Sequence, residues 1–455
     1  MAISAYPLLQ TSRGFSSYNA WHIALLLFGL CLIAYSPTFN NGFISDDFIM
    51  LDWVEQWEED FLFFFRMVPD VFRITGYAAF RILKGVFGYR PEFFYAFSIL
   101  VHVLNAVLLW KLLERLSGSR RVAVLAAVLF AVFQNPQEAI KWMAALADAL
   151  AGFCVLAALL FWLKEKFLWS SLFYLAGLFS KESAVVVILL IPLLEFSARR
   201  KLTLRNEHLY LLMPLLLFLV VFAVTTSSNY MLADGYYAFG PRGLLVLGIT
   251  LHRLMFPWLY VAILCYLVTQ RRQLPGELAS GLIWMTIGLS PFIFLTYQNH
   301  IPSRHQYIGS MGLVWAVAVL LEQLDRKRLR QALIAAFILI NIGYQWYVKD
   351  PQFERRAAPT NRLLEQLRRH PPGPLLLVDF PMNPWMARMA AKMVPGWQPD
   401  MMRINLPSDS CPDCLQLRWN EATQEFSVKP LPSPGPQDSS AREDARDRPA
   451  SKRNH

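Results

Sequence analysis

The sequence predicts an all-α polytopic membrane protein that ends in a small external α/β domain. Composition is the first observation: the 455 residues are 55% hydrophobic and 17% charged, with a mean hydropathy of +0.34. The second is that long apolar runs recur through residues 1–348. A soluble domain could not bury so much apolar surface, so the chain belongs in a membrane.

Eleven apolar stretches are read as membrane helices from their length and composition. They cover residues 21–37, 93–113, 122–134, 142–163, 167–180, 183–196, 209–226, 243–268, 278–297, 307–322 and 329–347. Two of them, 122–134 and 167–180, are short for a hydrocarbon core about 30 Å thick. The outer loops that follow them are therefore expected to line a recess below the membrane surface.

Lys and Arg residues gather in alternate loops, which predicts the orientation of the chain. The basic side includes Arg115, Arg120, Arg121, Lys164, Lys166, Arg199, Arg200, Lys201, Arg271, Arg272, Arg326, Lys327 and Arg328. The positive-inside rule places these loops, with the N-terminal segment 1–20, in the cytoplasm and the C-terminal region outside. The net charge of +10 is then an orientation signal, and no nucleic-acid partner is predicted. We expect a bacterial inner-membrane protein with its site facing the periplasm or exterior.

The first external loop, residues 38–92, is expected to form surface helices, because 47–57 carries apolar residues at helical spacing. Asp46 and Asp47 stand side by side where the first span ends. One interpretation makes them first-turn acids of a helix capped by Ser45. The other makes them a general base, a metal ligand, or both.

The second external segment contains Asn135, Pro136 and Glu138, a pattern typical of a helix N-terminus with a capping box. A functional role for Glu138 is the alternative. Asp148 lies inside the fourth predicted span, where an ionisable group is expected to face a cavity or a partner.

Two further external turns carry cations. Lys181 lies beside Glu182 and could extend to the membrane surface or bind a lipid phosphate. Arg304 and His305 precede Tyr307 in the last external hairpin. Arg binds phosphate oxygens bidentately, which makes Arg304 the stronger phosphate candidate, whereas His305 alone reads as a hydrogen-bonding residue.

These motifs resemble those of a known superfamily in order and spacing. The elements are Phe43–Phe48, Asn135–Glu138 with Trp142 and Ala147–Asp148, and Leu178–Glu182. Together they resemble the membrane part of the GT-C glycosyltransferases over residues 20–350, with the nearest likeness to the tetratricopeptide-repeat O-mannosyltransferases and their bacterial relatives. Two departures stand out: no repeat array follows the spans, and the acid pair is Asp-Asp where protein O-mannosyltransferases have Asp-Glu. The second departure leaves the role of Asp47 open.

The resemblance implies a membrane glycosyltransferase that moves a hexosyl or pentosyl unit, with a mannose-like sugar as one candidate, from a polyprenyl-phosphate donor to an acceptor on the external face. It implies that Asp46, first of the pair with Asp47, is the general base. The acceptor, whether lipid, glycan or protein, stays open, and membrane lipids are the surrounding partners.

The residue chemistry agrees with this reading. A polyprenyl phosphate departs as a stabilised anion and needs cations, while the acceptor hydroxyl needs a base. Lys181, Arg304 and His305 are expected to hold the donor phosphate. The supporting residues are Glu138, Asp148, Glu182 and Tyr307. No cofactor is predicted outright, and a divalent metal on Asp46, Glu138 and Asp148 is left open.

Residues 348–430 are expected to form a small external domain with helices at 363–369 and 386–393 and a strand at 374–380. Cys411 and Cys414 predict a disulfide rather than a zinc site, because no second ligand pair accompanies them. Residues 431–455 are rich in Pro, Ser and charge, which is typical of disorder.

A polytopic transporter or lipid flippase is the alternative function. Such proteins place ionisable residues at mid-membrane and often show repeated halves. Here only Asp148, His102 and a few amides approach that depth, no internal repeat is visible, and the polar motifs gather on one face. The sequence therefore favours glycosyl transfer within residues 21–347.

Overall fold

The computed structural model describes residues 17–66, 73–199, 206–226, 235–270, 274–295, 298–407 and 410–429. Two compact units, Met1–Ala357 and Ala358–His455, make up the chain. The predicted domain boundary at residue 348 and the observed division both fall within the continuous helical stretch Lys327–Arg369. The predicted tail 431–455, and nearly all of the predicted cytoplasmic segment 1–20, lie outside the described residues.

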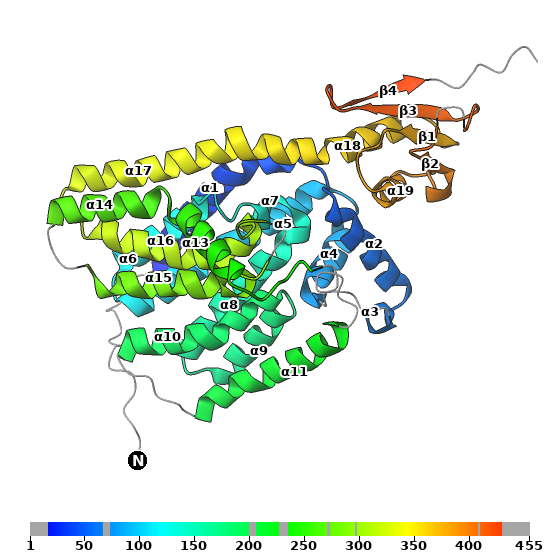
Figure 1. Cartoon of the computed structure of the whole chain (residues 1–455). Helices are drawn as coiled ribbons and strands as arrows, with labels where there is room; N and C mark the ends of the chain where they lie inside the picture. The colour runs from blue at the N-terminus through cyan, green and yellow to red at the C-terminus, as the bar shows by residue number, and fades with distance from the viewer. Residues whose placement is uncertain are drawn as a thin grey trace, which may run out of the picture. The chain divides into compact units, whose positions relative to one another are not determined.

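The described part of the first unit is built almost wholly of helices (Figure 1). Its α-helices are α1 (Ser17–Tyr35), α2 (Asp46–Glu59), α3 (Phe63–Arg66), α4 (Ile74–Phe87), α5 (Pro91–Ser117), α6 (Arg120–Val132), α7 (Glu138–Lys141), α8 (Leu146–Leu163), α9 (Phe167–Leu178), α10 (Val187–Arg199), α11 (Leu209–Thr226), α13 (Arg242–Met255), α14 (Trp258–Gln270), α15 (Gly276–Leu289), α16 (Tyr307–Glu322), α17 (Lys327–Tyr344) and α18 (Asp350–Arg369), which continues into the second unit.

Short 3-10 and π segments join these helices. They are η1 (Ser36–Asn40), η2 (Met143–Ala145), η3 (Glu182–Val186), η4 (Asn206–His208), η5 (Ser290–Phe292), η6 (Ser303–Gln306) and the π-helical η7 (Gln345–Lys349). Local chemistry explains several boundaries. Pro91 opens α5 at a position where no N–H is needed, and Gly118 ends it in the left-handed region at φ 62°. The Ser119 hydroxyl then accepts a hydrogen bond from the Val122 N–H and caps α6.

Five described helical stretches are long and apolar enough to cross a membrane: Ala20–Asn40, Pro91–Ser117, Met143–Leu163, Asn206–Val224 and Lys327–Arg369. The pair α13–α14, bent by 65°, makes a sixth if it is one span. The chain is therefore an integral membrane protein, but the predicted count of eleven spans is not supported. The other predicted spans coincide with shorter helices, among them α6, α9, α10, α15 and α16.

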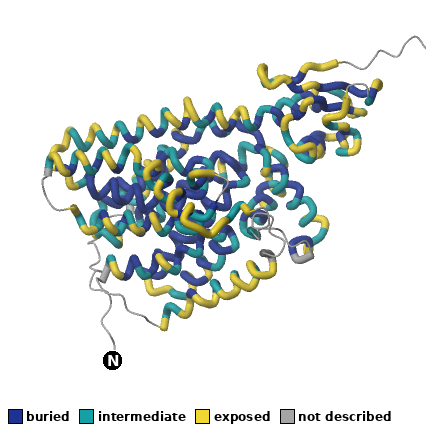
Figure 2. The backbone as a smooth tube through the Cα atoms, in the orientation of Figure 1, coloured by how far each residue is buried: buried dark blue, intermediate teal, exposed yellow. Residues whose placement is uncertain are grey.

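The difference in span count has a physical cause. A helix buried by its neighbours in a bundle is as apolar as one that faces lipid, so composition alone reads both as spans. Figure 2 shows α8 and α16 mostly buried, whereas α11 and α17 are largely exposed. Small residues allow the closest contact in this bundle, between α15 and α16. A Cβ atom on Gly312 would lie 2.4 Å from the backbone nitrogen of Met285.

The described residues of the loop 38–92, which is predicted to be external, form α2, α3 and α4, and α2 confirms the helix predicted over 47–57. Aromatic side chains hold these helices together. Phe64 stacks on Tyr77 with ring centroids 4.7 Å apart, and Trp57 meets Phe64 edge to face at 5.2 Å. The loop is thus a small packed layer that can fix the position of the acid pair at the start of α2.

The second unit contains a four-stranded sheet of order β2-β1-β3-β4. Its elements are β1 (Leu375–Val378), α19 (Pro384–Lys392), η8 (Pro399–Met401), β2 (Met402–Ile404), β3 (Leu415–Asn420) and β4 (Glu425–Lys429). The strand β1 is parallel to both of its neighbours, and β3 pairs with β4 in antiparallel fashion. A strand buried on both faces reads as a continuous apolar run, which is why 374–380 was predictable. The three other strands were not predicted.

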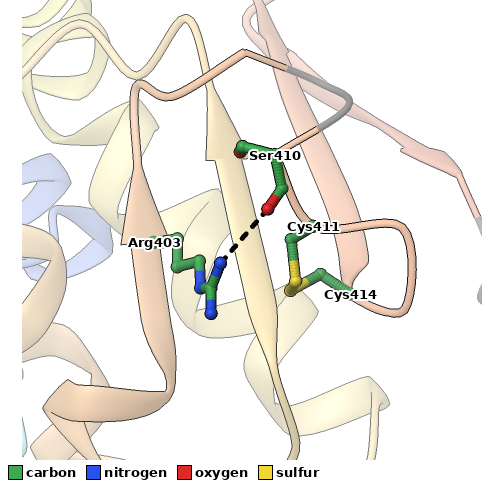
Figure 3. The surroundings of a disulfide bond; sticks show 4 residues. All are labelled: Arg403, Ser410, Cys411 and Cys414. Atoms are coloured by element: carbon green, nitrogen blue, oxygen red, sulfur yellow. Dashed lines mark hydrogen bonds between the residues drawn. A yellow bond between two sulfur atoms is a disulfide. The ribbon is translucent and has the colours of Figure 1, made fainter.

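The predicted disulfide is present in this unit. Cys411 and Cys414 are joined just before β3, with Cα atoms 5.4 Å apart. Figure 3 shows the bond, with Arg403 Nη1 donating to the carbonyl oxygen of Ser410 at 3.2 Å. Both sulfur-bearing side chains pack against Leu376 and Val378 of β1, so the disulfide belongs to the core of the sheet.

Candidate active site

A strained turn presents Asp46 at the start of α2. Ser45, the preceding residue, has φ 47° and ψ −109°, a backbone conformation that non-glycine residues rarely adopt. The Ser45 side chain makes no capping bond to α2. Strain of this kind costs about 1–3 kcal/mol and persists only where the surroundings hold it. The Asp46 side chain is exposed.

Asp47 is buried and supplies part of what holds the turn. One carboxylate oxygen accepts a hydrogen bond from the Ile44 N–H at 2.7 Å, and the other accepts from the Ala144 N–H at 2.6 Å. Burial raises the pKa of Asp47 to about 8, although the two backbone donors lower it. The two aspartates therefore have different environments. Asp47 joins the loop to η2, whereas Asp46 is exposed to solvent.

The charges of two arginines act on Asp46. Desolvation by the surrounding protein raises the pKa of Asp46, whereas the positive charges of Arg304 and Arg356 lower it. Arg304 comes from η6 and Arg356 from α18. The structure thus brings the first-loop acid and the last external hairpin to one place. Arg356 is a residue that the sequence reasoning missed, since it lies beyond the predicted spans.

Glu138 joins the same two arginines. Its Oε2 accepts from the Ser303 hydroxyl at 3.2 Å and from the Arg304 N–H at 3.3 Å, and its Oε1 lies 3.8 Å from Arg356 Nη1. The capping-box interpretation of this segment is wrong. Gln137 is the residue before α7 and makes no side-chain capping bond, and the Asn135 side-chain oxygen accepts from the Gln134 side chain.

Trp142 organises the arginines. Arg304 lies over its ring at 5.0 Å and Arg356 at 4.6 Å, both measured from the guanidinium carbon to the ring centroid. The indole N–H donates to the Ile44 carbonyl at 3.1 Å, two residues before Asp46. We call Asp46, Glu138, Trp142, Arg304 and Arg356 the external cluster.

Asp148, Lys181 and His305 form a second group inside the helix bundle, the buried triad. Lys181 Nζ pairs with Asp148 and lies 2.9 Å from His305 Nδ1, which is 3.4 Å from the other Asp148 oxygen. All three side chains are buried. The expectation that Asp148 faces a partner is met, whereas a surface-seeking Lys181 beside Glu182 is not found.

Electrostatics set the state of the buried triad. Burial lowers the pKa of Lys181 to about 8 against the opposing effect of Asp148. Burial and the charge of Lys181 lower the pKa of His305 to about 3, so this imidazole is neutral near pH 7. The Phe292 ring stacks on His305 with centroids 4.2 Å apart. Lys181 is thus already neutralised by Asp148, which limits its part in binding a phosphate.

Arg73 holds Glu182 and was not singled out from the sequence. Its Nη2 lies 2.9 Å from Glu182 Oε1, and Thr75 beside it donates to Ser180 at 2.7 Å. The negative charge of Glu182 is thereby matched by a cation from the first loop. These bonds fasten the start of α4 to the turn that carries Lys181.

The Tyr307 hydroxyl makes its hydrogen bonds within the helix bundle. This hydroxyl receives a hydrogen bond from Asn105 at 2.9 Å and lies 2.7 Å from His102 Nδ1, within the packed helices. The Tyr307 ring fills the space beside Gly152, where a Cβ atom would come within 2.8 Å of it. The structure therefore gives Tyr307 a packing role.

A buried ion pair that the sequence reasoning missed lies beside the external cluster. Lys141 Nζ is 2.5 Å from an oxygen of Asp350, and Thr38 lies within 3.5 Å of both partners. This pair joins α7, the end of the first span and the start of α18. No sequence motif pointed to it, because its members lie in three distant segments.

The metal question can be tested on the same residues. Among the described residues, no three or more His, Cys, Asp or Glu side chains are grouped so that they could share a metal ion. Glu138 is engaged by arginines and Asp148 by Lys181. The trio Asp46, Glu138 and Asp148 therefore does not fit a metal site.

Comparisons with known proteins give a likeness to solved structures. No family model matches the sequence, and no curated protein matches it. Among solved structures, the chain is similar to the oligosaccharyltransferase of Archaeoglobus fulgidus, crystallised with a tethered acceptor peptide, at a TM-score of 0.42 and 11% identity. The alignment covers 78% of this chain and 58% of that one, so the chain spans less than two thirds of its length.

Proposed function

We propose that this protein transfers a sugar from a polyprenyl-phosphate donor to an acceptor hydroxyl on the external face of the membrane. The observation that carries the proposal is that the two adjacent acids, Asp46 and Asp47, have different environments. Asp47 is buried and bonded twice to backbone, while Asp46 stays exposed on a strained turn, and the charges of Arg304 and Arg356 lower its pKa. A capping pair would need neither the strain nor the arginines.

In the proposed reaction Asp46 is the general base. Its carboxylate takes the proton of the acceptor hydroxyl as the oxygen bonds to C1 of the sugar. The bond between C1 and the phosphate oxygen breaks, and its electron pair leaves with the polyprenyl phosphate. No acid is needed, because the leaving group is a stabilised anion.

Arg304 is the proposed contact for the departing phosphate, with Arg356 as its neighbour. Guanidinium groups bind phosphate oxygens bidentately, and both lie next to the proposed base. Lys181 and His305, first expected to bind the phosphate, are assigned a positioning role because Asp148 already neutralises Lys181. Tyr307 is not part of the proposed site, because its hydroxyl bonds to Asn105 and His102 within the helix bundle.

The test uses the full chain purified in detergent with a panel of polyprenyl-phosphate sugars, following release of polyprenyl phosphate. Asp46→Asn should lower turnover by about 10²–10⁴-fold, the usual contribution of a general base. Glu59→Gln, an exposed acid at the other end of α2, is the matched control and should keep wild-type turnover. Full turnover by Asp46→Asn would remove Asp46 as the base, and intact donor moved across vesicles without cleavage would favour the flippase.

A further inference from the structure

A cavity of ≈ 420 Å³ borders the segment that contains Gln134, Asn135 and Gln137, and the proposed reaction does not use it. It lies in the first unit, between the bend of α13 and α14, the segments around Gln134 and Ser303, and the end of α17. Ser303 also donates to Glu138, so the cavity shares one wall with the external cluster.

Positive charge is concentrated in this cavity. Its described lining includes Arg253 and Lys349 together with the imidazoles of His252 and His300, and no Asp or Glu. No salt bridge joins Arg253 or Lys349 to a carboxylate within the described ranges of the chain. Burial and the charge of Arg253 lower the pKa of His300, which Glu138 opposes. Glu138, however, is already engaged by two arginines.

An unsatisfied acceptor points to a ligand with hydroxyl or N–H groups. Gln306 lines the cavity and is 4% exposed, and its side-chain oxygen has no hydrogen-bond partner among the described residues. Its amide nitrogen is used by the Ile301 carbonyl at 2.6 Å. A buried oxygen without a partner is costly, so a bound donor would be favourable here.

The rim of the cavity is apolar and open. Phe256 at the bend is 59% exposed, and Ile340 on α17 is 58% exposed. The residue Ile340 belongs to the spanning stretch Lys327–Arg369, and Phe256 ends the first helix of the bent pair. Apolar side chains left exposed on such helices suit contact with lipid chains.

From these contacts we propose that the cavity binds the phosphate group of a lipid, with Arg253 and Lys349 on the phosphate oxygens, Gln306 accepting from the headgroup, and the chains along Phe256 and Ile340. This site is separate from the external cluster and does not depend on glycosyl transfer. A soluble phosphate would use the same cations but would gain nothing from the apolar rim, which is why the lipid is favoured.

The experiment measures lipid retained by the purified full chain in native mass spectrometry. Dioleoyl phosphatidic acid is the probe, and dioleoyl phosphatidylcholine is the reference lipid with a blocked phosphate. Arg253→Gln with Lys349→Gln should weaken retention of phosphatidic acid by tenfold or more, since charge-assisted hydrogen bonds are each worth about a tenfold change. Lys327→Gln with Arg328→Gln removes the same charge from the exposed start of α17 and should leave retention unchanged.

Three outcomes decide the proposal. Equal retention by the cavity variant and the charge-matched control would overturn it. Displacement of the lipid by millimolar inorganic phosphate would identify a free-anion site and overturn the lipid assignment. Retention restored in Arg253→Lys with Lys349→Arg, together with loss in Ile340→Asp, would support both the cation and the rim. Thermal melting of each variant separates lost binding from lost folding.

Discussion

The Asp47 carboxylate accepts a hydrogen bond from the backbone N–H of Ala144 at 2.6 Å and thereby joins the first external loop to the second. This bond fixes where α2 begins relative to η2. The strained Ser45 lies between Ile44 and Asp47, and the Asp47 carboxylate also accepts a hydrogen bond from the Ile44 N–H. Asp47 makes the hydrogen bonds that anchor the loop, and the Asp46 side chain is exposed. The same pair of acids therefore serves as anchor and as the free carboxylate beside Arg304.

The first prediction separates the two aspartates by stability. Asp47→Ala leaves the Ile44 and Ala144 N–H groups buried without their acceptor, at roughly 1–3 kcal/mol for each group. Asp46→Ala removes an exposed side chain and should leave the melting temperature in detergent nearly unchanged. Thermal denaturation of the two variants beside the wild type makes the comparison. Equal melting temperatures for both variants would mean that Asp47 does not anchor the loop.

The second prediction concerns the buried triad. Lys181→Met leaves the Asp148 carboxylate buried without its cation, which costs about 3–5 kcal/mol in comparable buried pairs. Replacing both partners, as in Asp148→Leu with Lys181→Met, removes the uncompensated charge and should recover most of that loss. Unfolding free energies of the two variants decide the point. A double variant no more stable than Lys181→Met would show that the two charges are not coupled.

The third prediction tests the contact between α15 and α16. Gly312→Ala places a methyl group 2.4 Å from the Met285 nitrogen, so the helices must separate, at about 1–3 kcal/mol for overpacking. Gly343→Ala is the matched control on α17, where an added Cβ meets nothing within 4 Å. It should be neutral or slightly stabilising because Ala favours helix over Gly. Melting temperatures that fall equally in both variants would contradict the close contact.

Much of the fold could be predicted because apolar helices leave a strong pattern in sequence. Each predicted span overlaps helix in the described residues, although 243–268 is two helices, α13 and α14, bent by 65°. The number of spans could not be predicted, because α16 is apolar through burial rather than through contact with lipid. The strand β1 was predictable because its four residues, Leu375–Val378, are all apolar, and all four are buried in the structure. The strands β3 and β4 mix exposed and buried positions, and their pairing depends on partners that local sequence does not name.

The sequence allowed several residues of the candidate site to be predicted, but not which residues contact one another. Motif spacing selected Asp46, Glu138 and Arg304, and Arg304 pairs with Glu138 and lowers the pKa of Asp46. It also selected Tyr307, whose hydroxyl turns out to bond inside the bundle. The residues missed were those whose partner is distant in sequence: Arg356, Arg73 and the pair of Lys141 with Asp350. An ion pair between distant segments leaves no local periodicity to detect.

The last prediction rests on the proposed role of Asp46 as a base and concerns pH. Arg356 lowers the pKa of Asp46 in the structure, so removing its charge should raise that pKa. A base works when it is deprotonated. The acidic limb of the profile of kcat/KM against pH therefore reports the pKa of the base in the free enzyme. Arg356→Gln should therefore shift this limb to higher pH and reduce activity most on the acidic side.

Matched variants make this shift specific. Arg355→Gln removes the same charge from an exposed neighbouring position on α18 and should leave the limb in place, while Arg356→Lys should restore most of the wild-type profile. Arg356→Gln also loses a contact with Glu138, but a purely structural loss would lower kcat/KM by a similar factor at every pH. A profile lowered uniformly, with its acidic limb unmoved, would argue against Asp46 as the group that titrates.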